Sequence, residues 1–451
     1  MRANKRPLTV LFVLLSGCSF GVFSDLEDKA PAARVNQDDS EISSSSFGDH
    51  IVGLPRGASK EMKDATGGVL AITGNGDAAF ASATVAGGVR VAHAERSQVK
   101  DNLDAPIRIT AMAAAPSNEL VDNTISGPFA WVGSTSGEGS VRVLDVLTFK
   151  RIGAVHKAPN NVFPVTEFGA SVAAANLDGT GGGDDLAVGA KSALVLLLAD
   201  NSGGLRWPSM KEDTPLTVSE PAGSDWPSGS FSVIAAGNLD SSTPEDEVVA
   251  AVPEKNAVVV VHHISDCFKD TSVACKSYVR VRASDADRFG SALLVADVDD
   301  DKKPELVVGA PGVNKVYVYD LDSSHFDAAS PAKLPDPTVL VAGTDVREFG
   351  ASLAFGKLDG VRGLLAVGAP STVVGGTSSA GRIVLYDTSL KEVGEGVTLA
   401  TPEDKTLLGR NLTVIPYSKS GTRLDVLAAA GREAVFVFFA SLTSDHKDVR
   451  K

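Results

Sequence analysis

The sequence predicts an all-β protein built from seven repeated units, and two observations carry this prediction. Its apolar segments are short and rich in Val, Leu and Ala, and Gly, Pro and Asp separate them. The units recur at a near-constant period, because their first residues are 63, 58, 60 and 59 positions apart, at Phe168, Phe231, Phe289, Phe349 and Leu408. Small antiparallel sheets bury both faces when they pack radially. We therefore expect a seven-bladed β-propeller of four-stranded antiparallel blades over residues 48–440.

Composition limits the other possibilities. The chain has 451 residues with 42 Lys and Arg against 56 Asp and Glu, a net charge of −14 that argues against a nucleic-acid partner. Apolar residues make up 43% of the chain, enough to bury a large core. A sandwich or two barrels could use the same strands, but the regular period favours the propeller.

The N-terminus has the features of an export signal. Three basic residues precede a short apolar run, Leu8–Leu15, which is too short to span a bilayer core of about 30 Å. The sequence Leu-Ser-Gly-Cys that ends at Cys18 resembles the lipobox of bacterial lipoproteins. This resemblance implies a signal peptide over residues 1–17 and a lipid anchor at Cys18. In such lipoproteins an aspartate after the cysteine retains the protein at the inner membrane; here Ser19 follows, so the resemblance points to the outer membrane. An ordinary signal peptide is the alternative.

The two ends of the expected propeller are polar. Residues 18–47 are acidic, include a run of serines and lack apolar periodicity, so we expect a flexible linker that follows the anchor. Residues 441–451 are expected to form a C-terminal tail.

The clearest unit begins with Phe289-Gly290, continues through the acidic segment Asp297–Glu305 and Val308-Gly-Ala-Pro311, and ends with Lys315–Tyr319. The small residues of Val-Gly-Ala suit the narrow inner ends of the blades, where strands should crowd around the axis of the propeller. These motifs resemble FG-GAP repeats, whose type case is the seven-bladed propeller of integrin α subunits. The resemblance covers some 270 residues, but the first two units match it poorly.

The last unit shows only three strand-like segments, over residues 412–415, 425–430 and 434–439. The segment His50–Leu54 has the pattern of an outer strand, like Thr338–Ala342. We expect it to complete the last blade and close the ring.

The acidic segment Asp297–Glu305 predicts a calcium site. Carboxylates at positions 1, 3, 5 and 9 and a main-chain carbonyl at position 7 provide the alternating oxygens that a hard cation prefers, and they belong to Asp297, Asp299, Asp301, Glu305 and Lys303. The FG-GAP resemblance supports calcium, although Lys302 stands where the family prefers glycine. A solvated acidic turn is the alternative.

Two further units offer weaker calcium sites with fewer carboxylates. The ligands expected are Asn176, Asp178, Thr180 and Asp185 in one unit, and Asn238, Asp240, Ser242 and Glu247 in the other. The unit that contains Lys357 lacks a closing carboxylate, so no metal is expected there.

Cys267 and Cys275 lie between predicted strands at residues 257–262 and 278–282, which should bring the ends of this loop together. In an exported protein we expect them to form a disulfide; two free thiols are the alternative. His262 and His263 are adjacent on a strand, where side chains alternate between faces, so they are interpreted as structural.

The linear motifs of the common hydrolases, phosphate-binding loops and zinc proteases do not occur in the chain. We therefore expect a non-enzymatic, lipid-anchored, calcium-binding propeller of the cell envelope, which binds protein or glycan partners in the way that its integrin resemblance implies. Two alternatives stay open, namely a periplasmic scaffold for outer-membrane assembly and a hydrolase or lyase with a dispersed site.

Overall fold

The structure of the protein is a computed structural model. It describes residues 33–36, 50–55, 65–72, 77–84, 89–98, 109–114, 129–145, 150–158, 165–180, 185–199, 216–219, 226–269, 278–283, 286–326, 333–358, 363–394, 396–399, 402–415, 418–419, 422–423, 425–432 and 434–438. The expected signal peptide with Cys18, the C-terminal tail and Cys275 lie outside these residues.

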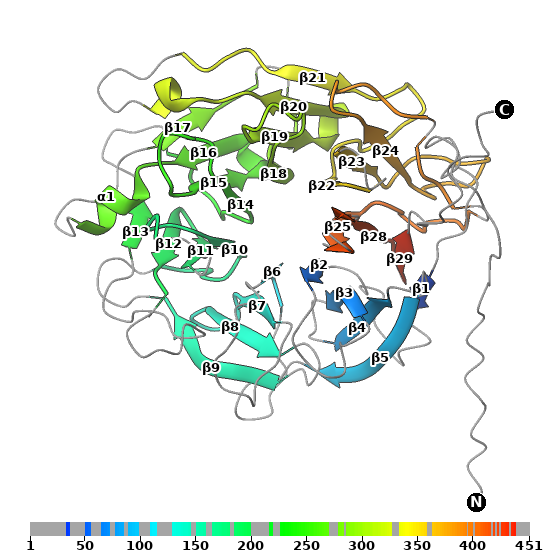
Figure 1. Cartoon of the computed structure of the whole chain (residues 1–451), viewed down its shortest axis with the longest axis horizontal. Helices are drawn as coiled ribbons and strands as arrows, with labels where there is room; N and C mark the ends of the chain where they lie inside the picture. The colour runs from blue at the N-terminus through cyan, green and yellow to red at the C-terminus, as the bar shows by residue number, and fades with distance from the viewer. Residues whose placement is uncertain are drawn as a thin grey trace, which may run out of the picture.

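The chain forms antiparallel sheets arranged around a central axis (Figure 1). Six of these sheets have four strands each. The first two sheets consist of β2 (His50–Pro55), β3 (Ala65–Ile72), β4 (Asp77–Thr84) and β5 (Val89–Gln98), and of β6 (Ala111–Ala114), β7 (Phe129–Ser134), β8 (Ser140–Asp145) and β9 (Lys150–Lys157). The next three consist of β10 (Ser171–Ala175), β11 (Asp185–Ala190), β12 (Ala193–Leu197) and β13 (Leu216–Ser219); of β14 (Val233–Gly237), β15 (Glu247–Val252), β16 (Ala257–Val261) and β17 (Tyr278–Val281); and of β18 (Ala292–Ala296), β19 (Glu305–Ala310), β20 (Lys315–Tyr319) and β21 (Thr338–Val341). The last consists of β25 (Asn411–Ile415), β28 (Val426–Ala430), β29 (Ala434–Phe438) and β1 (Ala33–Asn36).

The prediction of seven four-stranded blades is therefore corrected to six. The unit that begins at Phe349 forms a three-stranded sheet of β22 (Ser352–Gly356), β23 (Leu364–Ala369) and β24 (Arg382–Tyr386). In place of a regular fourth strand, an irregular segment covers the edge of β24, where the Ile383 and Val397 backbones exchange hydrogen bonds of 2.9 and 2.7 Å. Gly394 and Gly396 in this segment both have positive φ angles, which interrupt an extended strand.

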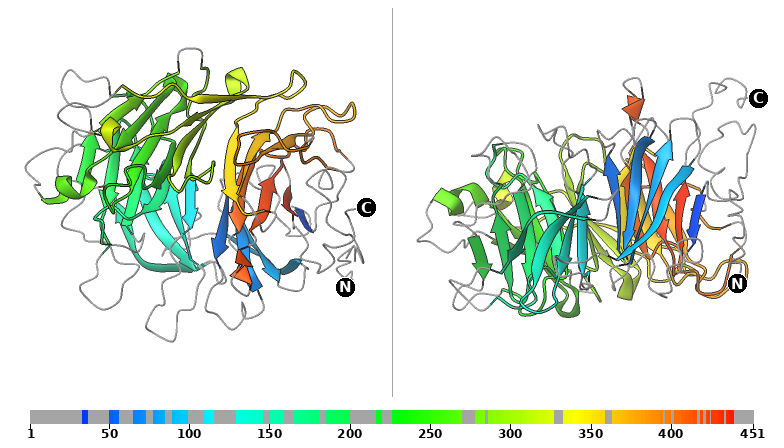
Figure 2. Two further views of the ribbon diagram at one scale, coloured as in Figure 1. Left: turned by 45° about the horizontal axis from the view of Figure 1, so that its top comes forward. Right: turned by 90° about the horizontal axis from the view of Figure 1, so that it is seen from below.

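The first strand of each sheet contacts the first strand of the next. These contacts join β2, β6, β10, β14, β18, β22 and β25, and β25 in turn contacts β2, so the arrangement closes on itself. Seen from the side, the sheets stand next to one another around the ring (Figure 2). The radial packing expected from the repeat period is confirmed.

Closure of the ring differs from the prediction. The segment His50–Pro55 does not complete the last blade, because it is the innermost strand of the first blade and pairs with β3. The last blade is completed instead by β1, whose residues 33–36 pair antiparallel with residues 434–437 of β29 (Figure 1). This strand lies inside the segment 18–47 that was expected to be a flexible linker, so that expectation was wrong for these four residues.

The repeated Phe-Gly and Val-Gly-Ala motifs join neighbouring blades. Phe289 and Phe349 are fully buried between sheets. A Cβ atom added to Gly309 would lie 2.0 Å from the Gly350 carbonyl oxygen, so only glycine allows this approach of two backbones. Ser352 also donates a 2.7 Å hydrogen bond across the blade boundary to the Gly409 carbonyl. The crowding expected around Val-Gly-Ala is thus contact between one blade and the Phe-Gly turn of the next.

Other elements are short. They are the helix α1 (Ile264–Lys269), the 3-10 helices η3 (Pro253–Lys255), η4 (Pro311–Val313) and η5 (Ser323–Phe326), and a hairpin of β26 (Ser418–Lys419) and β27 (Thr422–Arg423). Among the residues described, none of the helices has the length and apolar character needed to cross a bilayer.

Candidate metal centre

The loop between β18 and β19 is shaped by its own carboxylates. The carboxylate of Asp297 accepts a hydrogen bond of 3.0 Å from the Lys302 backbone N–H, and that of Asp299 accepts one of 3.1 Å from the Asp301 N–H. Asp301 in turn accepts a 2.8 Å bond from the Lys303 N–H. These bonds turn the chain so tightly that Asp300 and Lys302 adopt φ angles of 66° and 76°. The glycine that FG-GAP repeats, which this unit resembles, prefer at the Lys302 position would suit this left-handed conformation.

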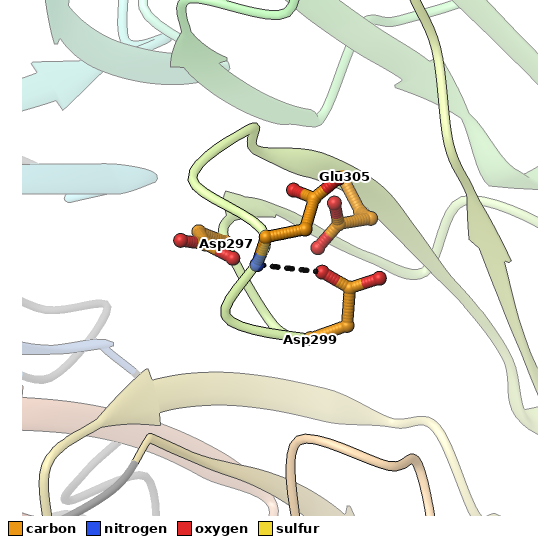
Figure 3. Close-up of side chains that lie close together, drawn as sticks. Asp297, Asp299 and Glu305 are labelled. Atoms are coloured by element: carbon orange, nitrogen blue, oxygen red, sulfur yellow. Dashed lines mark hydrogen bonds between the residues drawn. The ribbon is translucent and has the colours of Figure 1, made fainter.

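Four carboxylates of this loop converge. One oxygen from each of Asp297, Asp299, Asp301 and Glu305 lies within 4.8 Å of the other three. Figure 3 shows Asp297, Asp299 and Glu305 close together around the loop, with the hydrogen bond to Asp299 as a dashed line. Asp299 and Asp301 are exposed, whereas Glu305 is only 2% exposed. The group therefore combines an open side toward solvent with a buried carboxylate at its base.

Two oxygen atoms of this group are buried without a hydrogen-bond partner. They are Oδ1 of Asp297 and Oε1 of Glu305, while the other oxygen of Glu305 accepts a 2.7 Å bond from the Val298 N–H. Buried polar atoms nearly always have a partner, and an exception calls for an ion or a water. A cation between the carboxylates would satisfy both atoms.

The protonation behaviour of the loop reflects burial and crowding. Burial raises the pKa of Glu305 to about 7, and the negative charges of Asp299, Asp301 and Asp297 raise it further against the opposing hydrogen bond from Val298. The pKa of Asp299 is also raised, first by burial and then by its carboxylate neighbours. Without a cation, the loop thus holds negative charge with difficulty.

These residues fit calcium. All the donors are oxygens, the preferred ligands of hard cations, and the flexible 6- to 8-fold coordination of Ca²⁺ suits a loop that supplies four carboxylates and leaves room for solvent. The Lys303 carbonyl, at position 7 of the loop, remains the fifth predicted protein ligand. When bound, the ion would neutralise the clustered charge and tie β18 to β19.

The loop between β14 and β15 is held differently. The side-chain N–H groups of Asn238 donate bonds of 2.6 and 3.0 Å to the carbonyls of Thr243 and Glu245. Glu247 is buried and accepts bonds from the N–H groups of Leu239 and Asp240, at 2.7 and 2.9 Å. Burial raises the pKa of Glu247 to about 8.

Asp240, which is also buried, uses one oxygen to accept bonds of 3.0 and 2.6 Å from the backbone N–H and the hydroxyl of Ser242. In contrast to the Asp297 loop, no side-chain oxygen of Asp240 or Glu247 is among the buried atoms without a hydrogen-bond partner in the described part of the chain. Calcium at this loop stays a prediction.

The described residues of the loop after β10 are joined by hydrogen bonds, and calcium at this loop stays a prediction. Both carboxylate oxygens of Asp185 accept 2.8 Å bonds from backbone N–H groups, those of Leu177 and Ala199. Asp178 accepts bonds of 2.9 and 2.6 Å from the backbone N–H and the hydroxyl of Thr180. Asn176 points its side-chain N–H at the Pro244 carbonyl of the next blade, 2.8 Å away. Both carboxylate oxygens of Asp185 are thus engaged in hydrogen bonds with the backbone, which favours a structural role for this residue.

Sequence reasoning missed two carboxylates that brace loops from a neighbouring blade. Asp246 accepts a 2.8 Å bond from the Asn176 N–H, and burial raises its pKa. Asp425, which is buried, accepts a 2.9 Å bond from the Lys357 N–H. Each lies close to the start of the second strand of its own sheet, but nothing in the linear spacing indicates a partner some 70 residues away.

The two adjacent histidines and Cys267 have other surroundings. His262 is buried, and this burial lowers the pKa of His262 to about 4. The ring of His263 lies 4.8 Å from it between centroids, and its Nε2 atom is 2.9 Å from the Phe326 carbonyl. No metal-binding group of three or more such residues in the described part of the chain includes either histidine. Cys267 lies on α1, and its pairing with Cys275 stays a prediction because Cys275 is outside the described residues.

Comparisons with known proteins agree with the fold. The FG-GAP repeat model matches residues 289–319, which contain the four-carboxylate loop. Among solved structures, the chain is similar to the β-propeller domain of Myceliophteria thermophila Cps50 (Swd1), with a TM-score of 0.51 and 11% identity over 89% of this chain and 98% of that one. At this identity the likeness shows the propeller fold alone. The comparison with curated proteins found no match.

Proposed function

We propose that this protein is a non-enzymatic, calcium-binding β-propeller that is anchored by a lipid at the cell envelope and binds protein or glycan partners. The observation that carries the proposal is the group of four convergent carboxylates, in which Glu305 has a buried oxygen without a partner. The same residues lie within the stretch that matches the FG-GAP repeat.

A stiffening role for the cation fits its position better than catalysis. Every carboxylate of the group accepts a backbone N–H bond within its own loop. An ion there would hold the turn between β18 and β19 in one conformation, whereas the other loops of the ring could vary in sequence and shape. Stiffened loops on a propeller rim form a recognition surface at low entropic cost, because less chain has to be ordered on binding.

Calcium should stabilise the folded protein. Binding to the native state at about 100 times the dissociation constant adds about 2.7 kcal/mol, so the melting temperature should rise with calcium and fall with a chelator. Asp299→Ala should lose most of this response, whereas Asp287→Ala should keep it because Asp287 is exposed at the start of the same blade, before β18. A response that is unchanged in Asp299→Ala would place the ion elsewhere.

The envelope location rests on the N-terminal sequence. Cys18→Ala should abolish incorporation of a metabolic lipid label, since only this thiol can accept the diacylglyceryl group; label on the variant would remove the anchor from the proposal. Partners are best sought by crosslinking in intact cells followed by capture of the protein. Protease treatment of intact cells separates a surface receptor from a periplasmic assembly scaffold, the second candidate.

A further inference from the structure

We infer that Asp320, which follows β20, is a further carboxylate of the cation centre and strengthens calcium binding from a strand outside the loop. This inference rests on the proposed function, because it concerns the same ion.

Strand register places Asp320 beside the centre. The last pair of the β19–β20 ladder is Leu306 opposite Tyr319. Continued by one residue past the end of β20, the same antiparallel register puts Asp320 opposite Glu305. Residues directly opposite each other project from the same face of a sheet, with Cβ atoms about 4.5–5.5 Å apart. The carboxylate of Asp320 therefore lies on the same side as that of Glu305, where the loop ends.

The surroundings of Asp320 differ from those of the equivalent residue in the next blade. Asp320 is exposed, and within the described residues its carboxylate takes part in no hydrogen bond or ion pair. Asp387 occupies the same register position in the three-stranded sheet, opposite Leu364, and its carboxylate accepts bonds of 2.9 and 3.2 Å from Ser389 and Lys391. There the aspartate shapes a turn, whereas the register puts Asp320 opposite an acidic residue, Glu305.

The placement is unfavourable without an ion. Like charges directly opposite each other destabilise a strand pair, and Glu305 and Asp320 both carry a carboxylate. Among the described residues, this is the one blade that combines an acid in this register position with four convergent carboxylates. The residues opposite Asp185 and Glu247 in the same register are Leu198 and His262. A divalent ion would turn the repulsion into attraction.

The effect should be electrostatic or mediated by water. Asp320 is not among the four residues whose ligand atoms lie within 4.8 Å of one another, so it stands outside the inner ligands. For a carboxylate roughly 8 Å from a divalent ion in a water-like dielectric, Coulomb attraction corresponds to about a fivefold gain in affinity. Salt should weaken this contribution, since an exposed charge is screened.

Calorimetric titration of the full chain with calcium tests the inference. Asp320→Asn should bind about fivefold more weakly than the wild type at low salt, and the difference should shrink near 1 M salt. Asp320→Glu should keep near wild-type affinity. Asp287→Asn, the same charge change on an exposed residue before β18, should bind as the wild type does.

Equal affinities of Asp320→Asn and the wild type at low salt would overturn the inference and leave the proposed function intact. An equal loss in Asp287→Asn would also overturn it, because the effect would then come from net charge alone. Absence of calcium binding by the wild type would instead overturn the proposed function, and this inference with it.

Discussion

The buried carboxyl group of Glu305 should make the cation-free protein less stable as the pH rises. Burial and the neighbouring carboxylates raise the pKa of Glu305 from 4.5 to about 7 on folding. Between these values the folded protein binds more protons than the unfolded chain, so stability falls as the pH rises through this window. For a shift of this size, the free energy of unfolding should fall by about 2.5 kcal/mol between about pH 5 and about pH 8.

Urea unfolding of the wild type and Glu305→Gln, each in a chelator, measures this loss. Glutamine cannot titrate, yet its side-chain oxygen can still accept the 2.7 Å bond from the Val298 N–H. Glu247 also has a raised pKa and contributes in the same direction, so the difference between the two proteins isolates Glu305. Saturating calcium should abolish the loss in the wild type, because the ion stabilises the carboxylate. The same pH dependence for both proteins in chelator would refute the reasoning.

Two further predictions concern the ring. Gly309→Ala should lower the free energy of unfolding by about 1–3 kcal/mol through overpacking, because its Cβ would lie 2.0 Å from the Gly350 carbonyl oxygen. Gly343→Ala is the control for thermal melts, because its Cβ would meet only the Asp345 side chain, at 3.0 Å. Equal losses of stability in the two variants would contradict the backbone-contact argument. A chain that begins at residue 45 lacks β1 and exposes the edge of β29, so it should lose about 2 kcal/mol relative to a chain that begins at residue 32. Equal urea midpoints would show that β1 contributes nothing to closure.

The fold was predictable from sequence as far as each unit is local. The repeat period and the strands of the later units follow from apolar patterning, and the structure confirms them. The closing strand was not predictable, because β1 is only four residues long and lies in a polar segment whose composition resembles a linker. Its stability comes from pairing with β29, about 400 residues away, and no local pattern encodes such a partner.

The expectation for His50–Pro55 failed for a related reason. An outer and an inner strand can have the same apolar pattern, and only the pairing partner distinguishes them. Here β3 provides that partner, which lies nearby in sequence and costs less chain entropy to reach than β29 does.

The candidate site shows where a repeat pattern stops being sufficient. The Asp297 loop and the Asn238 loop both have an aspartate at position 3 and a closing glutamate, but the Asn238 loop is one residue longer, has Ser242 at position 5 and begins with an amide. The residue at position 1 alters how the loop can close. A carboxylate at Asp297 leaves an oxygen buried without a partner, which favours a cation, whereas the amide of Asn238 donates to the Thr243 and Glu245 carbonyls. The amide thus supplies as hydrogen bonds the positive charge density that an ion would otherwise bring. We therefore expect calcium sensitivity to concentrate in the blade formed by β18 to β21, with the neighbouring blades keeping their shape in a chelator.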